Sequence, residues 1–404
     1  MTGRWGAQRL WRYATRDANN LGPPERPLHH LSGTHLSTWA SSIPTILVPP
    51  AIFLGLLLTL WAWKCFWIVL LQDRLLYLSW LPPLSRSEKI EDYAREFSGV
   101  QWSETFITSL DGTRLAVCEG RLPAPVGGDK TTRENETKRV RLVICYFQGN
   151  GGSTPLRLPL LSLVMKSIHE SKSSPSAGNR GGVESEYECI LAALSYRGYW
   201  KSSGRATQRG IEADATAFLN WVHETYSSEH EDLRIVLWGH SLGAAVASSA
   251  LARLLASTDT AKEDKIAGLI LEAPISSIKD MLIALYPQKW LPYRYLHPFS
   301  WNHWDVAHNL EQLAHHQKQN RNQNRGSSPR NGPTSGRVPR ILLLSAENDE
   351  VIPLWVADQL EQRGRDLGLE ILRVNVKGAM HFEASMKGDG RGALVRFVRG
   401  CMGR

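Results

Sequence analysis

Apolar runs of strand length alternate with longer amphipathic stretches through the chain from about residue 100. Several of these runs are rich in β-branched and aromatic residues and are bounded by glycine, proline or acidic turns, which is typical of buried strands. Periodicities typical of helices lie between them, at 211–226 and 356–368. The predicted strands are 104–120 (two strands joined by an Asp-Gly turn), 141–147, 189–199, 234–238, 266–274, 340–353 (a strand that ends in an acidic turn) and 369–382.

These runs are apolar throughout, and most do not alternate between apolar and polar positions. Strands of that kind are covered on both faces, which is the situation in a mostly parallel sheet with helices on its two sides. The pattern therefore predicts an α/β fold with one large domain at residues 100–400.

One segment before this domain is apolar over the length of a bilayer span. Residues 46–71 are apolar except for Lys64, and about 20 such residues suffice to cross a membrane. Tryptophans at 61, 63 and 67 would form an interfacial belt. We expect a single transmembrane helix between a basic tail (1–45) and a linker (72–99); the alternative is a hydrophobic helix packed on the domain.

Three polar segments interrupt the strand–helix alternation, at 123–139, 170–186 and 315–338. Each contains too few apolar residues to bury a surface of its own. We expect surface loops without a catalytic role.

The formal net charge of +8 would permit a nucleic-acid partner, but its distribution does not favour one. Residues 1–45 hold five arginines against two acids, and residues 316–340 hold six basic residues and no acid. The rest of the chain is therefore near neutral, without a basic groove. Metal-ligand spacing is not found in the sequence either, so we expect neither a metal nor a cofactor.

The strand predicted at 234–238 leads into Gly239-His240-Ser241-Leu242-Gly243, a G-x-S-x-G motif. A nucleophilic serine on a sharp strand-to-helix turn needs small neighbours, because the strand and the helix crowd its flanks. A serine hydroxyl is inert at its free pKa, so it also needs a base and an acid that orients the base.

Later strands supply both groups in the order Ser, Asp, His. Asp349 follows the apolar run that begins at 340, and His381 lies at the end of the last predicted strand. This order, with each residue at a strand's carboxyl end, is the one that an α/β-hydrolase fold requires. Glu347 and Glu350 compete with Asp349 for the role of the acid.

A glycine-rich loop, YFQGNGG at 146–152, follows the strand that would supply a second oxyanion donor. It lacks the following Lys-Ser/Thr pair of a P-loop, which excludes that alternative.

With these motifs, the chain resembles the α/β-hydrolase-fold serine hydrolases, and most closely the single-pass, membrane-anchored α/β-hydrolase-domain proteins of eukaryotes, fungal members in particular. The matching stretches include LQDRLLYL after the apolar segment, LWGHSLGAA, AENDEVIP and KGAMHFE. The family usually has His-Gly-Asn in the oxyanion loop, where this chain has Gln148-Gly149-Asn150.

The resemblance implies an eight-stranded type of sheet, a cap at about 275–310, and an oxyanion hole formed by the backbone N–H groups of Leu242 and Asn150. It implies a serine hydrolase that cleaves an ester or thioester. The apolar segment and the many aromatic and apolar residues of the cap favour a lipid or acylated substrate at the membrane surface. The alternatives are a serine peptidase and a catalytically silent membrane scaffold.

The location follows from the apolar segment and the charges that flank it. If the arginine-rich tail stays in the cytosol, the domain faces the other side, and we expect the endoplasmic reticulum. Asn135-Glu136-Thr137, a glycosylation sequon, would report this orientation.

Overall fold

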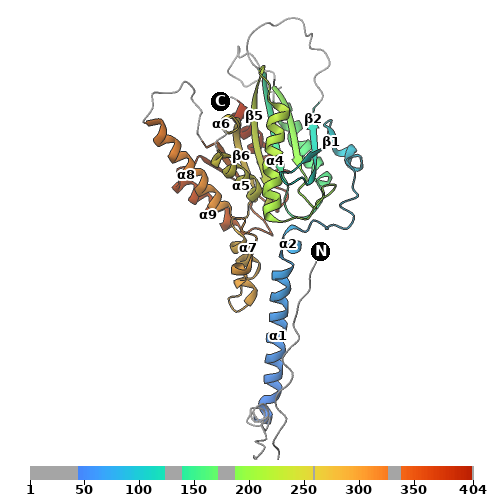
Figure 1. Cartoon of the computed structure of the whole chain (residues 1–404), viewed down its shortest axis with the longest axis vertical. Helices are drawn as coiled ribbons and strands as arrows, with labels where there is room; N and C mark the ends of the chain where they lie inside the picture. Colours follow the sequence, from blue (N-terminus) through green and yellow to red (C-terminus); the bar gives the residue numbers. More distant parts are fainter. Residues whose placement is uncertain (1–43, 123–138, 172–186, 258–259, 326–337, 403–404) are drawn as a thin grey trace, which may run out of the picture. The chain divides into compact units, whose positions relative to one another are not determined.

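A computed structural model describes residues 44–122, 139–171, 187–257, 260–325 and 338–402 (Figure 1). The chain divides into two units, residues 1–59 and 60–404. Helix α1, Val48–Leu70, begins in the first unit and ends in the second. The predicted basic tail and the sequon at Asn135 lie outside the described residues.

The second unit is built on an eight-stranded sheet in the order β1-β2-β4-β3-β5-β6-β7-β8. The pairs β1–β2 and β2–β4 are antiparallel and all the others are parallel, which confirms the predicted fold class. The strands are β1 (Gln101–Thr108), β2 (Arg114–Arg121), β3 (Arg139–Phe147), β4 (Tyr187–Leu194), β5 (Glu231–His240), β6 (Ile266–Glu272), β7 (Arg340–Ala346) and β8 (Ile371–Val376).

Helices follow most of the strands, as parallel connections require. After α1 come α2 (Gln72–Tyr77), α3 (Leu158–Glu170), α4 (Gln208–Tyr226), α5 (Leu242–Ala256), α6 (Thr260–Glu263), α7 (Ile278–Leu285), α8 (Val306–Arg325), α9 (Leu354–Asp366) and α10 (Gly388–Met402). Short 3-10 helices lie at Thr45–Leu47, Ile90–Glu96, Pro155–Arg157, Pro292–Tyr295 and His297–Phe299.

The central strand β3 explains why its sequence is apolar without alternation. Val143, Cys145 and Phe147 point into one apolar cluster with α4, α5, α8 and α9. Leu142 and Ile144 point into a second cluster, which contains residues of α3 and α10. Successive side chains of a strand face opposite sides, so a strand between two layers of helices must be apolar at every position.

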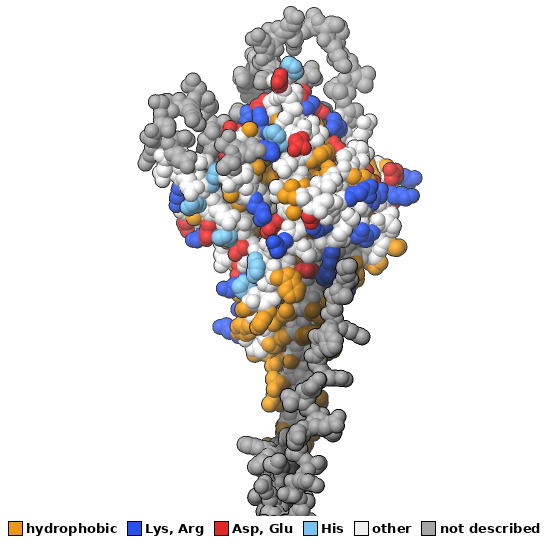
Figure 2. Space-filling model, viewed as in Figure 1, with side chains coloured by type: hydrophobic (Ala, Val, Ile, Leu, Met, Phe, Trp, Pro, Cys, Tyr) orange, Lys and Arg blue, Asp and Glu red, His pale blue; other side chains and the backbone are white. Residues whose placement is uncertain are grey.

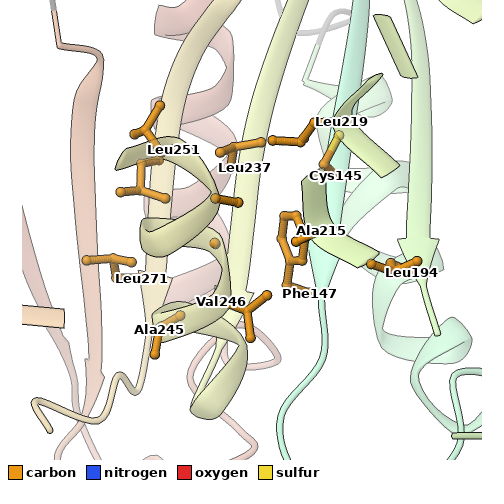
Figure 3. Packing of buried hydrophobic residues seen from close by; sticks show 14 of the residues in the cluster. Cys145, Phe147, Leu194, Ala215, Leu219, Leu237, Ala245, Val246, Leu251 and Leu271 are labelled. Atoms are coloured by element: carbon orange, nitrogen blue, oxygen red, sulfur yellow. The ribbon is translucent and has the colours of Figure 1, made fainter. Parts of the chain in front are cut away.

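Helix α5 is the helix packed most directly on the strands that carry the G-x-S-x-G turn. Its Ala245 and Leu251 lie on the side of Leu271 of β6 and Leu237 of β5, and its Val246 lies beside Phe147 of β3 (Figure 3). The small residues that follow Ser241 therefore allow the helix to lie close to the sheet.

Residues Thr45–Leu70 form one helical stretch long and apolar enough to cross a membrane. Its bounds agree with the predicted segment at 46–71, and α1 contributes no buried residue to the core. A helix that is apolar all round and buries nothing in its own chain is typical of a bilayer span.

Three expectations about individual elements are wrong. The segment 315–338 is not a loop throughout, because α8 continues to Arg325. The first half of α8 is anchored in the core by the buried residues Leu310 and Leu313. The polar residues that follow extend the same helix, in which Asn320 Nδ2 lies 2.7 Å from His316 Nε2. The polar composition of residues 315–325 therefore did not predict their helical backbone.

The last strand is also shorter than predicted. β8 ends at Val376, and Gly378 then adopts a φ of +61° in a turn, so His381 lies in a loop and not at the end of a strand. The run at 189–199 similarly ends as a strand at Leu194.

Candidate active site

Ser241 is the single residue between the end of β5 and the beginning of α5. Its φ of 53° and ψ of −118° lie in a region that non-glycine residues rarely adopt. Its backbone N–H donates to the carbonyl oxygen of Glu272, at the end of β6, over 2.8 Å. Such strain persists only where the surroundings fix it, and it clusters at functional sites.

The two glycines of the motif are required by backbone contacts. A Cβ added to Gly239 would lie 2.2 Å from the carbonyl oxygen of Gly243, and one added to Gly243 would lie 2.0 Å from that of Phe147. Strand β5, helix α5 and the end of β3 therefore approach each other too closely for any side chain. This close approach forms the sharp turn that the sequence predicted.

His381 and Asp349 contact each other directly. The imidazole Nδ1 lies 3.0 Å and 2.9 Å from the two carboxylate oxygens of Asp349, and both side chains are almost fully buried. Asp349 Oδ1 also accepts backbone N–H groups from Val351 at 2.9 Å and Ile352 at 2.7 Å. The Asp349 carboxylate is therefore held in place by backbone N–H groups as well as by its contact with the imidazole.

The two competing acids have other contacts. Glu347 Oε2 accepts the backbone N–H of Gly378 over 2.7 Å, and Glu350 Oε2 accepts that of His381 over 3.0 Å. Neither carboxylate bonds to the imidazole ring. Glu347 and Glu350 fix the loop that carries His381, whereas Asp349 orients its ring.

His240 has a role that the sequence did not indicate, because it occupies the variable position of the motif. Its ring is buried, with its centroid 5.0 Å from that of His381, and its Nε2 donates to the His381 carbonyl oxygen at 3.1 Å. Burial, followed by the charges of His381 and Arg157, lowers the pKa of His240 well below its usual range. A neutral His240 thus links the residue before Ser241 to the loop that carries His381.

The glycine-rich loop after β3 lies beside Ser241. A Cβ added to Gly149 would be 3.0 Å from Nδ1 of His240 and 3.4 Å from Cβ of Ser241, so the backbone of this loop lies next to both residues. Asn150 follows Gly149, and Leu242 opens α5 directly after Ser241. Both predicted oxyanion donors therefore belong to segments that border the serine.

Gln148, the departure from the family pattern, is buried inside this loop. Its Oε1 accepts from the Thr154 hydroxyl at 2.9 Å, and its carbonyl oxygen accepts from the Tyr196 hydroxyl at 2.9 Å. The amide side chain therefore fastens the loop to the residues that follow it, at a place where an imidazole would be expected.

Taken together, an eight-stranded, mostly parallel sheet, a serine on a strained turn after its fifth strand and an Asp–His pair from the loops after its last two strands define a hydrolase of the α/β class. The α/β hydrolase family model matches residues 176–386, just over half of the chain. The chain belongs to the α/β hydrolase family.

Curated relatives come from plants, fungi and animals. The chain is 30% identical over 224 residues to the α/β-hydrolase domain-containing protein WAV2 of Arabidopsis thaliana, covering 55% of this chain and 58% of that protein. It is 28% identical over 157 residues to protein bem46 of Schizosaccharomyces pombe, covering 38% and 42%. It is 29% identical over 194 residues to the lysophosphatidylserine lipase ABHD12 of Danio rerio, covering 46% and 44%.

These matches span about half the length of each relative, so the activity of the whole relative does not carry over to this chain. Among solved structures, an α/β hydrolase from Vibrio vulnificus aligns with a TM-score of 0.51 at 15% identity, over 81% of this chain and 92% of that one. At that identity the similarity concerns the fold alone.

The backbone crowding at the G-x-S-x-G turn predicts the effect of adding one methyl group there. Gly243→Ala would place a Cβ against the Phe147 carbonyl and should lower the free energy of unfolding by at least about 3 kcal/mol. Gly388→Ala, where an added Cβ meets nothing within 4 Å, should change it by less than about 0.5 kcal/mol. Denaturant unfolding of both variants measures the difference, and equal stabilities would contradict the predicted crowding.

Proposed function

We propose that this protein is a membrane-anchored serine hydrolase that cleaves an ester or thioester bond of a lipid or acylated molecule, with Ser241 as the nucleophile, His381 as the base and Asp349 as the acid that orients it. The observation that carries the proposal is the pair of contacts from the His381 ring to Asp349, together with the strained backbone of Ser241. Each is costly to build and is explained by catalysis.

The first half of the reaction forms an acyl-enzyme. His381 Nε2 accepts the Ser241 proton while Oγ attacks the substrate's carbonyl carbon, and the carbonyl oxygen becomes negatively charged. The backbone N–H groups of Leu242 and Asn150 stabilise that charge. The bond to the leaving alcohol or thiol then breaks, and His381 returns the proton to it.

The second half repeats these steps with water. His381 takes a proton from a water molecule that attacks the acyl-enzyme, and the released carboxylic acid leaves Ser241 with its proton restored. Throughout, Asp349 stabilises the imidazolium and fixes the tautomer that leaves Nε2 free to accept a proton.

Exposed apolar side chains of the cap favour a lipid substrate. Leu285, Trp290, Tyr295, Phe299 and Trp301 are each more than half exposed, and Figure 2 shows hydrophobic side chains gathered around the α7 region. Exposed apolar patches mark contacts with a membrane, a ligand or another protein, and we take this one as a lipid contact because it belongs to the same chain as the candidate membrane span.

The same cap region contacts the carboxyl-terminal half of α1. The ring centroids of Trp61 and Trp290 are 5.9 Å apart, and Lys64 Nζ lies 4.4 Å from the centroid of the Tyr293 ring. Tryptophan and lysine at a helix end are typical of the bilayer interface. A cap at the depth of the bilayer interface would meet lipid headgroups. One of the relatives is named as a lysophosphatidylserine lipase. A lysophospholipid is therefore the first substrate to assay.

The nucleophile is tested by turnover of a lysophospholipid in mixed micelles. Ser241→Ala should reduce turnover by on the order of 10⁴-fold or more, because the acyl-enzyme can no longer form. Ser249→Ala, a partly exposed serine on the same helix, is the matched control and should keep wild-type turnover. Undiminished turnover in Ser241→Ala would refute the assignment.

The acid is tested by amide substitutions in its turn. Asp349→Asn should slow the same reaction by about 10⁴-fold, since an amide favours the wrong imidazole tautomer. Glu347→Gln should have a small effect, because that carboxylate holds only the Gly378 N–H. If Glu347→Gln is the damaging change and Asp349→Asn is nearly silent, the acid must be reassigned.

The membrane anchor and its orientation are tested in microsomes. Alkaline carbonate should leave the chain in the membrane fraction, because about 20 apolar residues in a helix span a bilayer. With the domain in the lumen, an endoglycosidase should shift the mobility of the wild type but not of Asn135→Gln. Release by carbonate would contradict the anchor, and digestion of the domain by protease outside sealed vesicles would contradict the orientation.

A further inference from the structure

The proposed mechanism leaves one sequence motif without a role, the LQDRLLYL stretch that follows the apolar helix. In the structure most of it forms α2, and two of its residues, Asp73 and Tyr77, are buried. A buried carboxylate and a buried phenol in so short a helix need partners, because an unpaired polar group in the interior is costly. These partners lie far away in the sequence.

Gln72 and Asp73 bind the segment that closes the cap. Gln72 Oε1 accepts the backbone N–H of Trp301 over 2.9 Å, and Asp73 Oδ1 accepts from Asn302 Nδ2 at 2.8 Å and from the indole N–H of Trp301 at 3.0 Å. The motif therefore fixes the point where the chain returns from the cap to the domain.

Tyr77 extends these contacts in two directions. Its hydroxyl donates to Asn302 Oδ1 over 2.6 Å and accepts from the Trp304 indole N–H at 3.0 Å. Its backbone carbonyl oxygen accepts the N–H of Gly151 over 3.0 Å and also the Tyr199 hydroxyl. One buried residue thus contacts the end of the cap through its side chain and the glycine-rich loop through its backbone.

The next residue of that loop is held in the same way. Gly152 donates its N–H to the carbonyl oxygen of Leu81 over 2.7 Å, and Gly151 and Gly152 have φ values of +67° and +73°. Two consecutive loop N–H groups are therefore directed at the juxtamembrane segment, residues 72–81. Since Gly149 packs against Ser241, a shift of this segment would move the loop relative to the serine.

We propose that the juxtamembrane segment positions the oxyanion loop, with Tyr77 as the residue that joins the loop to the end of the cap. The proposal rests on the function proposed above, because it assumes that this loop stabilises the oxyanion. Tyr77 is a positioning residue, since its contacts are with Gly151, Asn302, Trp304 and Tyr199 and not with Ser241.

The kinetic test uses the full-length protein in detergent micelles. Tyr77→Phe keeps the ring and the backbone bond to Gly151 but removes the hydroxyl that holds Asn302 and Trp304. Loss of an oxyanion donor costs about 10²–10³ in kcat, so a displaced donor should cost about tenfold, with KM within about twofold of the wild type. Affinity for a trifluoromethyl ketone, whose adduct carries an oxyanion, should fall by the same factor as kcat.

Tyr226→Phe is the matched control. Tyr226 is equally buried, and its hydroxyl donates to Glu119, which lies on β2 and outside the candidate site. This variant should lose stability as Tyr77→Phe does while keeping kcat and ketone affinity. If the two variants lose kcat equally, Tyr77 acts through stability alone and the proposal is wrong.

Hydrogen exchange tests the positioning without any turnover. Tyr77→Phe should speed amide exchange in a peptide that contains residues 148–152, and Tyr226→Phe should not. Unchanged exchange in that peptide would overturn the proposal. Failure of the proposed hydrolase function gives a different result from failure of the positioning proposal. In that case Ser241→Ala would retain its turnover of the lysophospholipid, whatever the effect of Tyr77→Phe.

Discussion

The site depends on one backbone contact, the approach of Gly243 to the carbonyl oxygen of Phe147. No Cβ fits between them, so the first turn of α5 lies directly against the end of β3. Ser241, two residues before Gly243, has a positive φ, and Gly149 of the glycine-rich loop lies beside it. The proposed nucleophile and the loop proposed to stabilise its oxyanion thus meet at the same tightly packed place.

The parallel sheet supplies the other two groups. Strands β5, β6, β7 and β8 are neighbours in the order of the sequence, so their carboxyl ends lie along one edge. Asp349 follows β7 and His381 follows β8, and ligand sites of open parallel sheets form at that edge. The side-chain carboxylates of Glu347 and Glu350 accept backbone N–H groups of the loop that carries His381. The Asp349 carboxylate is itself held by two backbone N–H groups, so both members of the Asp–His pair are fixed.

Features set by local pattern could be predicted from the sequence, whereas features set by distant contacts could not. The apolar runs identified the buried strands, and small residues around Ser241 identified the turn, because each pattern reports its own packing. The end of β8 depends on a turn at Gly378, and the helical extension to Arg325 depends on the part of α8 already anchored in the core. The contacts of His240 with His381 and of Tyr77 with Asn302 join residues that are 141 and 225 positions apart.

Mapping of a covalent fluorophosphonate adduct on the detergent-solubilised full-length chain tests the central claim most directly. Such a reagent reacts with a serine only where a base activates the hydroxyl and oxyanion donors receive the phosphoryl oxygen. The G-x-S-x-G turn and the Asp349–His381 pair predict a single adduct on Ser241, which is lost in Ser241→Ala and strongly reduced in Asp349→Asn. An adduct on another serine, or equal labelling of Ser241→Ala, would contradict the assignment of Ser241 as the nucleophile.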